Sequence, residues 1–295
     1  MKTNNVFSCI SPCKVNDFLY IVGKTTNGYH KLQTLFTVLK YGDTMTFESA
    51  QNDGLIEIQG PFDFPQEQNL IYKAAALLKR KYAINKGIKI SVIKRLPEGG
   101  GLGGGSGNAA TTLLVLNRIW DLNLSEAELI SMGNDLGADV PLFIKGTTTF
   151  GQGTGEILQE VKLPTRWYLV VNPGCKVPTK ELFALPELKR DSPVRTLEQL
   201  LKIPFENSFT PCVIKRYPQV QKLLDELSAY GNVACMSGSG SSCFVRFSSK
   251  KKCTDAFNDF LSRHDEFKVF MAPSCNENPV VSDLNKFLLH QTVLH

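Results

Sequence analysis

The sequence predicts a two-domain α/β (α+β) protein, on three observations. The chain has 295 residues, and a typical domain has about 100–200. Strand and helix patterns follow one another along both halves of the chain, which is typical of mixed α/β and α+β architectures. A glycine-rich and polar stretch at 151–165 precedes a new strand pattern. We therefore expect an N-terminal domain at 1–160 and a C-terminal domain at 161–295.

Composition narrows the class of protein. Hydrophobic residues make up 42% and charged residues 21% of the chain, which excludes disordered and fibrous classes. The net charge of +5 is compatible with an anionic substrate, but it is too small to indicate a nucleic-acid-binding protein. No apolar run approaches the roughly 18 residues of a membrane span, and Met1–Lys14 lacks the apolar core of a secretion signal. Eight scattered cysteines are expected to be free thiols in a reducing, cytoplasmic setting.

Three strands and three helices are predicted in the first half. Alternating polarity predicts strands at Thr44–Ala50 and Leu55–Gln59, and β-branched residues predict another at Ile88–Lys94. A helix is expected from Asn69 to Tyr82, with Leu70, Ala74, Leu77 and Leu78 on one face. The helix after a glycine run has its buried stripe at Ala109, Leu113, Leu116 and Trp120. The next helix begins with a capping box at Ser125 and Glu128 and ends at Gly137.

The second half predicts an α+β domain. A strand is expected at Trp167–Asn172, and strands at Cys243–Phe247 and Phe267–Met271 flank a helix at Cys253–Arg263. An amphipathic helix stops at Gly231. Its apolar positions are Val220, Leu223, Leu224, Leu227 and Tyr230.

The run Gly99–Asn108, with seven glycines in ten residues between a strand and a helix, is the strongest functional signal. Glycine costs backbone entropy, so a dense run needs a reason. Without Cβ atoms, successive N–H groups can converge on phosphate oxygens at a helix N-terminus. A flexible linker is the alternative. No Walker A triplet occurs. The GxGxxG match at Gly99, Gly101 and Gly104 is followed by a helix and then by a second helix from Ser125, whereas a Rossmann unit needs a second strand with an acidic residue there.

The residues 97–106 resemble the central phosphate-binding motif of the GHMP small-molecule kinases. Residues 11–16 and 236–242 resemble the family's N-terminal and C-terminal motifs, in the right order. Further segments narrow the resemblance to a member whose substrate is a cytidine diphosphate derivative of methylerythritol. These segments are Gly28–Leu35, Asn69–Ile71, Leu136–Pro141 and Pro178–Thr179.

The resemblance implies a fold and an activity. The expected fold is a ribosomal-protein-like α/β domain followed by an α+β domain, with the site in the cleft between them. The expected activity is transfer of the ATP γ-phosphoryl group to a substrate hydroxyl, in non-mevalonate isoprenoid synthesis. ATP and Mg²⁺ are the implied cofactors, with Mg²⁺ bridging phosphate oxygens and no chain residue assigned as a metal ligand. Nucleic acid and membrane partners are not expected, and the chain is expected to be a monomer or weak dimer.

The resemblance also implies the site residues. The ATP-binding residues are Asn69, Lys94, Pro97, Gly99, Gly100, Gly101, Leu102, Gly103, Gly104, Gly105, Ser106 and Gly107. The substrate-binding residues are Asn16, Tyr29, His30, Thr179, Phe183, Ser237 and Gly238. The catalytic residues are Lys14 and Asp139.

Each role has a structural alternative. Asp139 is implied as general base, although the residue alone also fits a hydrogen-bonded structural acid. Lys14 is implied to keep Asp139 ionised and to offset negative charge on the transferring phosphoryl group. An isolated lysine in such a segment is, however, more often a surface residue. Tyr29 and Phe183 are implied to sandwich a cytosine, with His30 at the base edge, although ordinary packing fits them too. Asn69 also fits a helix N-cap, and Lys94 a strand-edge charge.

Two positions depart from the family pattern. Gly107 stands where a second serine is expected, and Asp17 puts an extra carboxylate near the expected substrate pocket. Three other functions stay open: a GHMP kinase acting on a sugar, mevalonate or homoserine, a dinucleotide-dependent oxidoreductase, and an RNA-binding module. Tyr29 and Phe183 discriminate against the first, because those substrates have no base to stack.

Overall fold

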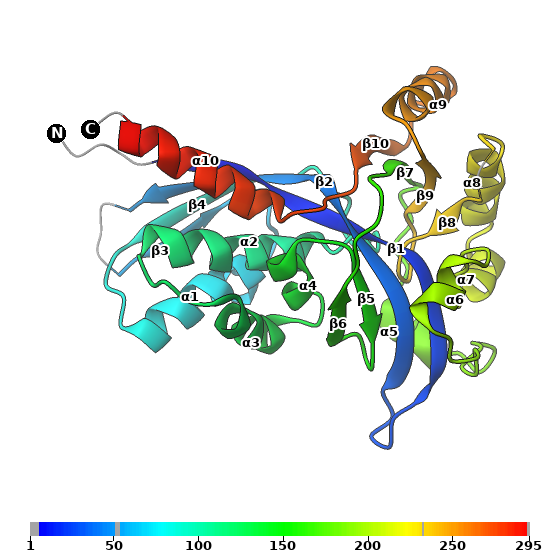
Figure 1. Cartoon of the computed structure of the whole chain (residues 1–295), viewed down its shortest axis with the longest axis horizontal. Helices are drawn as coiled ribbons and strands as arrows, with labels where there is room; N and C mark the ends of the chain where they lie inside the picture. The colour runs from blue at the N-terminus through cyan, green and yellow to red at the C-terminus, as the bar shows by residue number, and fades with distance from the viewer. Residues whose placement is uncertain (1–5, 51–53, 232, 294–295) are drawn as a thin grey trace.

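The computed structural model describes residues 6–50, 54–231 and 233–293, and within them the strands form two sheets. The first sheet has six strands in these residues, in the order β3-β4-β2-β5-β6 with β1 on the other edge of β2. Its strands are β1 (Phe7–Lys24), β2 (His30–Ser49), β3 (Ile56–Gln59), β4 (Ile88–Ile93), β5 (Thr149–Gln152) and β6 (Ile157–Glu160). Figure 1 shows β1 and β2 as a long ribbon that reaches from the first half of the molecule into the second.

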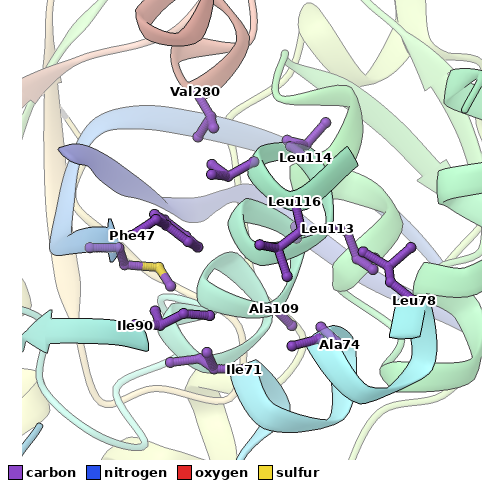
Figure 2. Close-up of a cluster of buried hydrophobic side chains, with 14 of the residues drawn as sticks. Phe47, Ile71, Ala74, Leu78, Ile90, Ala109, Leu113, Leu114, Leu116 and Val280 are labelled. Atoms are coloured by element: carbon purple, nitrogen blue, oxygen red, sulfur yellow. The ribbon is translucent and has the colours of Figure 1, made fainter. Parts of the chain in front are cut away.

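Helices of the first half pack on this sheet and form its core. They are η1 (Gln66–Gln68), α1 (Leu70–Tyr82), α2 (Gly104–Ile119), α3 (Glu126–Leu136) and α4 (Val140–Lys145). Figure 2 shows α1 and α2 meeting through Ile71, Leu78 and Leu113, opposite Phe47 of β2. Helix α2 is buried on every side from Gly107 to Asn117. Its position at the centre of this layer fixes where its N-terminus points.

The second sheet has the order β10-β7-β9-β8. Its strands are β7 (Trp167–Asn172), β8 (Cys235–Met236), β9 (Cys243–Phe247) and β10 (Lys268–Pro273). The helices around it are α5 (Thr179–Ala184), α7 (Thr210–Arg216), α8 (Pro218–Ser228) and α9 (Lys250–Arg263). Helix α6 (Leu197–Leu201) packs instead on β1, β2 and β5 of the first sheet through Leu200. The last helix, α10 (Pro279–Val293), returns to the first sheet, where Val280 and Leu284 join the core of α1 and α2.

Strand β1 connects the two halves. Phe7 belongs to the core under α1 and α2, Val15 to a central cluster, and Ile21 to the core of the second sheet. Eleven consecutive residues, 11–21, are buried. Because one strand runs through three cores, side chains on both of its faces are covered, and the sequence has no alternation there.

Most predicted elements of the sequence are confirmed. The strands at Trp167–Asn172 and Cys243–Phe247 have the predicted bounds, and the capping box of Ser125 and Glu128 is formed at the start of α3. Helix α9 begins three residues before the predicted Cys253, because Ser249 caps it. All eight cysteines are free thiols. No helix of the described residues is long and apolar enough to cross a membrane.

Two predictions stay untested. The division at 160/161 stays a prediction, and so does the absence of a signal in Met1–Lys14, of which residues 1–5 lie outside the described residues.

Candidate active site

The glycine loop connects β4 to α2, and a buried carboxylate fixes its start. Asp43 of β2 is fully buried. Its Oδ1 accepts hydrogen bonds from the backbone N–H groups of Arg95 and Leu96 at 2.8 and 3.0 Å. Its Oδ2 accepts from Lys94 Nζ and, at 3.0 Å, from Asn108 Nδ2 of α2. One side chain therefore holds both ends of the loop.

The glycine loop lines a cavity of about 410 Å³. The carbonyl oxygens of Gly100, Gly101 and Leu102 accept hydrogen bonds from Ser242, Ser237 and Lys14. In contrast, the N–H groups of Gly101, Leu102 and Gly103 have no acceptor within the described residues. The first N–H groups of α2 are also without partners inside the helix. These donors at a helix N-terminus form a site for an anion such as a phosphate chain.

Every ATP-binding residue of the sequence analysis except Gly107 lines this cavity. The lining residues are Phe62, Phe64, Gln68, Asn69, Leu70, Lys94, Pro97, Glu98, Gly99, Gly100, Gly101, Leu102, Gly103, Gly104, Gly105, Ser106 and Asn108. Asn69 is the N-cap of α1, accepting from the N–H of Ile71 at 3.0 Å. Its buried Nδ2 has no partner in the described residues, so the cap leaves a donor available at the cavity.

The glycine loop also contacts the C-terminal glycine turn, which is formed by residues 236–242. Ser237 Oγ donates to the Gly101 carbonyl at 2.9 Å and accepts from the Asn16 N–H at 3.3 Å. A Cβ at Gly101 would lie 2.1 Å from the Ser237 carbonyl oxygen, and its φ is +76°. Only glycine fits there, because the two halves of the chain meet backbone to backbone.

Gly101→Ala and Gly99→Ala separate this contact from backbone strain. Gly99 has a similar φ of +66°, but a Cβ there meets nothing within 4 Å. We expect Gly99→Ala to lower the free energy of unfolding by about 1 kcal/mol from the left-handed backbone alone. Gly101→Ala should cost about 2–4 kcal/mol, because the Ser237 turn must move away. Urea titrations measure both, and equal losses would contradict the contact.

Lys14 and Asp139 meet beside the loop. Lys14 Nζ lies 3.8 Å from Asp139 Oδ2 and donates to Asn16 Oδ1 at 2.7 Å. The lysine side chain is 6% exposed and that of Asp139 34%. Burial lowers the pKa of Lys14, and the charge of Asp139 acts in the opposite direction. Gly238 packs next to this group, because a Cβ there would lie 3.4 Å from both Lys14 Nζ and Asn16 Oδ1.

The residues implied in base recognition are only partly brought together. His30 and Phe183 stack with ring centroids 4.6 Å apart and an interplanar angle of 27°. Tyr29 is 65% exposed. Thr179 Oγ1 and Ser239 Oγ are 2.7 Å apart, which connects α5 to the C-terminal glycine turn. The His30–Phe183 stack leaves no space for a base between those two rings.

The two departures from the family pattern do not act at the loop cavity. A Cβ at Gly107 would lie 2.6 Å from the Pro12 carbonyl oxygen and 3.3 Å from Ser11 Oγ. The position therefore faces β1, and glycine allows α2 to approach that strand closely. A hydroxyl there would not point to a phosphate in the cavity.

The Asp17 carboxylate was expected near the substrate pocket, and the structure places it elsewhere. It accepts hydrogen bonds from Thr37 and Tyr168 and pairs with Arg246 at 3.5 Å. Burial raises the pKa of Asp17, and Arg246 opposes that shift. These residues line a larger cavity of about 1210 Å³, which includes neither Lys14 nor the glycine loop. Asp17 therefore belongs to the contact between the two sheets.

Three residues that position the site carry no motif, and the sequence analysis missed them. Asp43 holds the loop. Asn207 donates to the carbonyls of Met236 and Gly238 at 2.7 and 2.8 Å and so holds the C-terminal turn. Arg190 holds His30. The sequence around these three residues contains no recognisable motif, because each of them forms hydrogen bonds with a segment that is distant in the chain.

Known proteins match the chain along most of its length. Residues 69–147 match the family described as GHMP kinases N terminal domain, and residues 184–263 the family described as GHMP kinases C terminal. The 4-diphosphocytidyl-2-C-methyl-D-erythritol kinase of Haemophilus ducreyi is 42% identical over 94% of this chain and 97% of its own length. The chain belongs to the GHMP kinase family. This confirms the resemblance and the two-domain GHMP kinase fold.

Other GHMP kinases agree with this result. The Vibrio cholerae protein of the same name is 44% identical over 92% of each chain. A crystal structure of 4-(cytidine 5'-diphospho)-2C-methyl-D-erythritol kinase has a TM-score of 0.80 and 29% identity, and covers 91% of this chain. The chain is therefore an ATP-dependent small-molecule kinase, and the alternatives of an oxidoreductase and an RNA-binding module do not hold as its class.

Proposed function

We propose that this GHMP kinase transfers the γ-phosphoryl group of ATP to a hydroxyl of 4-diphosphocytidyl-2-C-methyl-D-erythritol. The products are ADP and the 2-phosphate, in the methylerythritol phosphate pathway to isoprenoid precursors. Relatives named for this reaction support the substrate. The observation that carries the chemistry is the meeting of Lys14 and Asp139 beside a loop in which the N–H groups of Gly101, Leu102 and Gly103 have no acceptor among the described residues.

The residues divide the work of phosphoryl transfer. The free N–H groups of the loop and of the start of α2 hold the triphosphate, and Lys94 at the cavity adds positive charge. Asp139 takes the proton from the substrate hydroxyl. Lys14 stabilises the charge on the transferring phosphoryl group, and Asn16 holds its ammonium in place. The protein then acts mainly by positioning and electrostatics, as in other phosphoryl transfers.

The side chains present suit a Mg²⁺ ion that arrives with the nucleotide. Within the described residues, no cluster of three or more His, Cys, Asp or Glu side chains could hold a metal by itself. Mg²⁺ in kinases is commonly held by one or two protein oxygens and the substrate phosphates. The Ser106 hydroxyl at the cavity is the protein oxygen that would hold it. When bound, the ion neutralises phosphate charge.

The substrate half of the site is proposed on the contacts of the C-terminal glycine turn and of His30. The Ser237 hydroxyl contacts the backbone of Asn16, and Thr179 of α5 contacts Ser239 of the same turn. His30, Phe183 and Tyr29 form the proposed base subsite. Location in the cytoplasm, a monomer or weak dimer, and the lack of nucleic acid or membrane partners stay predictions.

A parallel assay of phosphate acceptors tests the proposal. ATP is offered with the cytidyl substrate, mevalonate, homoserine and galactose, and ADP release is followed by a coupled reaction. We expect turnover with the cytidyl substrate and at least about 10²-fold lower kcat/KM with the others, because they lack the base. Comparable turnover with any of the other three would overturn the proposed substrate.

A further inference from the structure

Arg190 makes an unusually complete set of contacts for a half-buried residue outside every motif. Its Nη1 donates to the Leu188 carbonyl at 2.8 Å, and its Nη2 donates to the Phe183 and Leu185 carbonyls at 2.9 and 2.5 Å. Its Nε donates to Nε2 of His30 at 3.1 Å. The guanidinium thus ties the end of α5 to the first residue of β2.

The last of these contacts decides where the His30 proton lies. A guanidinium has five donors and no acceptor, so Nε2 of His30 must accept and carries no proton. In a neutral imidazole the proton is then on Nδ1. Nδ1 of His30 has no hydrogen-bond partner within the described residues, so its N–H is free for a ligand.

The charges around His30 keep the ring neutral. Burial lowers the pKa of His30, and the nearby charges of Arg190 and of Lys24 at the end of β1 lower it further. The ring is therefore a single N–H donor at neutral pH and stays so somewhat below its usual pKa of about 6.5.

The stack on Phe183 sets the direction of that donor. The imidazole lies over the Phe183 ring at an interplanar angle of 27°. A base that accepts from Nδ1 lies beside the imidazole and near its plane, so the stack on Phe183 sets the plane in which the base is held, and the exposed Tyr29 lies in the adjacent turn. Cytosine offers N3 as an acceptor at this edge, whereas uracil carries N3–H and would place a donor against a donor.

We propose that Arg190 is a positioning residue that fixes His30 as the neutral Nδ1–H tautomer and thereby makes the site prefer cytosine over uracil. This inference rests on the proposed function for its substrate, but the tautomer is a property of the protein alone. No substrate contact is assigned to Arg190 itself.

The tautomer is tested first, by ¹⁵N NMR of the imidazoles in the full-length protein without ligand at pH 7.5. The chain has four histidines, and the spectrum of His30→Gln identifies the His30 signals. We expect a protonated Nδ1 and an unprotonated Nε2 in the wild type. In Arg190→Met the Nε2–H form should become populated. A wild-type His30 protonated on Nε2 would overturn the proposal.

Base preference is tested second, as the ratio of kcat/KM for the cytidine substrate to that for its uridine analogue. We expect Arg190→Met to lower this ratio about 10-fold through KM, since the fixed Nδ1–H donor of His30 that distinguishes the two bases is lost. Arg190→Lys keeps the charge but not the planar donor set, so it should lower the ratio as well. An unchanged ratio in both variants would refute the role in specificity.

The pH dependence separates this role from a structural one. With the methionine variant, the KM for the cytidine substrate should fall as the pH falls through about 6.5, because the imidazolium carries a proton on Nδ1 whichever tautomer the neutral ring prefers. The wild-type KM should stay flat over that interval. The same pH dependence of KM in both proteins would contradict the proposal.

Arg216→Met is the matched control, because Arg216 pairs with Glu187 at 3.1 Å in the same region and does not touch His30. It should change neither the tautomer nor the ratio. If both nucleotides fail as substrates while His30 carries its proton on Nδ1, the proposed function is wrong and the assignment of the tautomer stands.

Discussion

Asp139→Asn is expected to lower kcat by about 10²–10⁴-fold, the usual contribution of a general base. The amide keeps the size of the side chain but cannot take the proton of the substrate hydroxyl. The Kd for ATP should stay within a few-fold, because Asp139 is not among the residues that line the loop cavity. Single-turnover kinetics and nucleotide titration measure the two quantities.

Loss of the charge of Asp139 has a second effect, on Lys14. That charge opposes the lowering of the Lys14 pKa by burial, so the variant also favours a neutral lysine. If only the lysine charge mattered, kcat of the variant would recover as the pH falls and Lys14 takes up a proton. We expect no recovery between about pH 8 and 6, because the base itself is absent.

Asp135→Asn is the matched control. Asp135 lies near the end of α3, is exposed, and has no contact with Lys14. The same change of charge there should leave kcat within about twofold. Near-normal turnover of Asp139→Asn would remove the assignment of the base.

The fold was predictable where local chemistry decides the structure. The capping box at Ser125 specifies its helix by itself, and the apolar strand at Trp167–Asn172 is bounded by turn residues. Strand β1 was not recognised, because residues 11–21 are buried on both faces and have no period of two. Helix α2 begins at Gly104, inside the glycine run, because its buried contacts outweigh the poor helix propensity of glycine.

The site was predictable only as a set of motifs. The glycine run signals a phosphate loop because a local backbone property does the binding. Lys14 and Asp139 are 125 positions apart, and their distance of 3.8 Å depends on how β1 and α4 pack. Asp17 was misplaced because adjacent residues of a strand point to opposite faces, so the position of Asn16 does not carry over to its neighbour. Residues that position others, such as Asp43, form no local pattern at all.

Asp43→Asn is expected to destabilise the protein by about 3–5 kcal/mol, the usual cost of breaking a buried ion pair. The Oδ1 atom can still accept from the two backbone N–H groups of Arg95 and Leu96. At the other atom, an NH₂ group would face the ammonium of Lys94 and the amide of Asn108, which are both donors. Buried donors without acceptors carry the full cost of desolvation.

The loss should also appear in ATP binding at temperatures where the variant is still folded. Asp43 holds the backbone that enters the loop and the helix that leaves it, so the N–H groups of Gly101 and Gly103 lose their fixed direction. We expect the Kd for ATP to rise about 10-fold or more, since the site depends on preorganised donors. Isothermal titration after a melting curve measures both effects on one sample.

Glu48→Gln is the control on the same strand. Glu48 of β2 pairs with Lys89 of β4 at 4.0 Å, with the two side chains 40% and 32% exposed. Its loss should change the free energy of unfolding by less than about 0.5 kcal/mol, because exposed ion pairs contribute little. Each variant removes one negative charge from an acidic residue of β2 that pairs with a lysine. The lysine is Lys89 of β4 for Glu48, and Lys94, which follows β4, for Asp43. A large difference between them therefore measures burial and the loop contacts of Asp43, while equal effects would mean that the loop needs no such anchor.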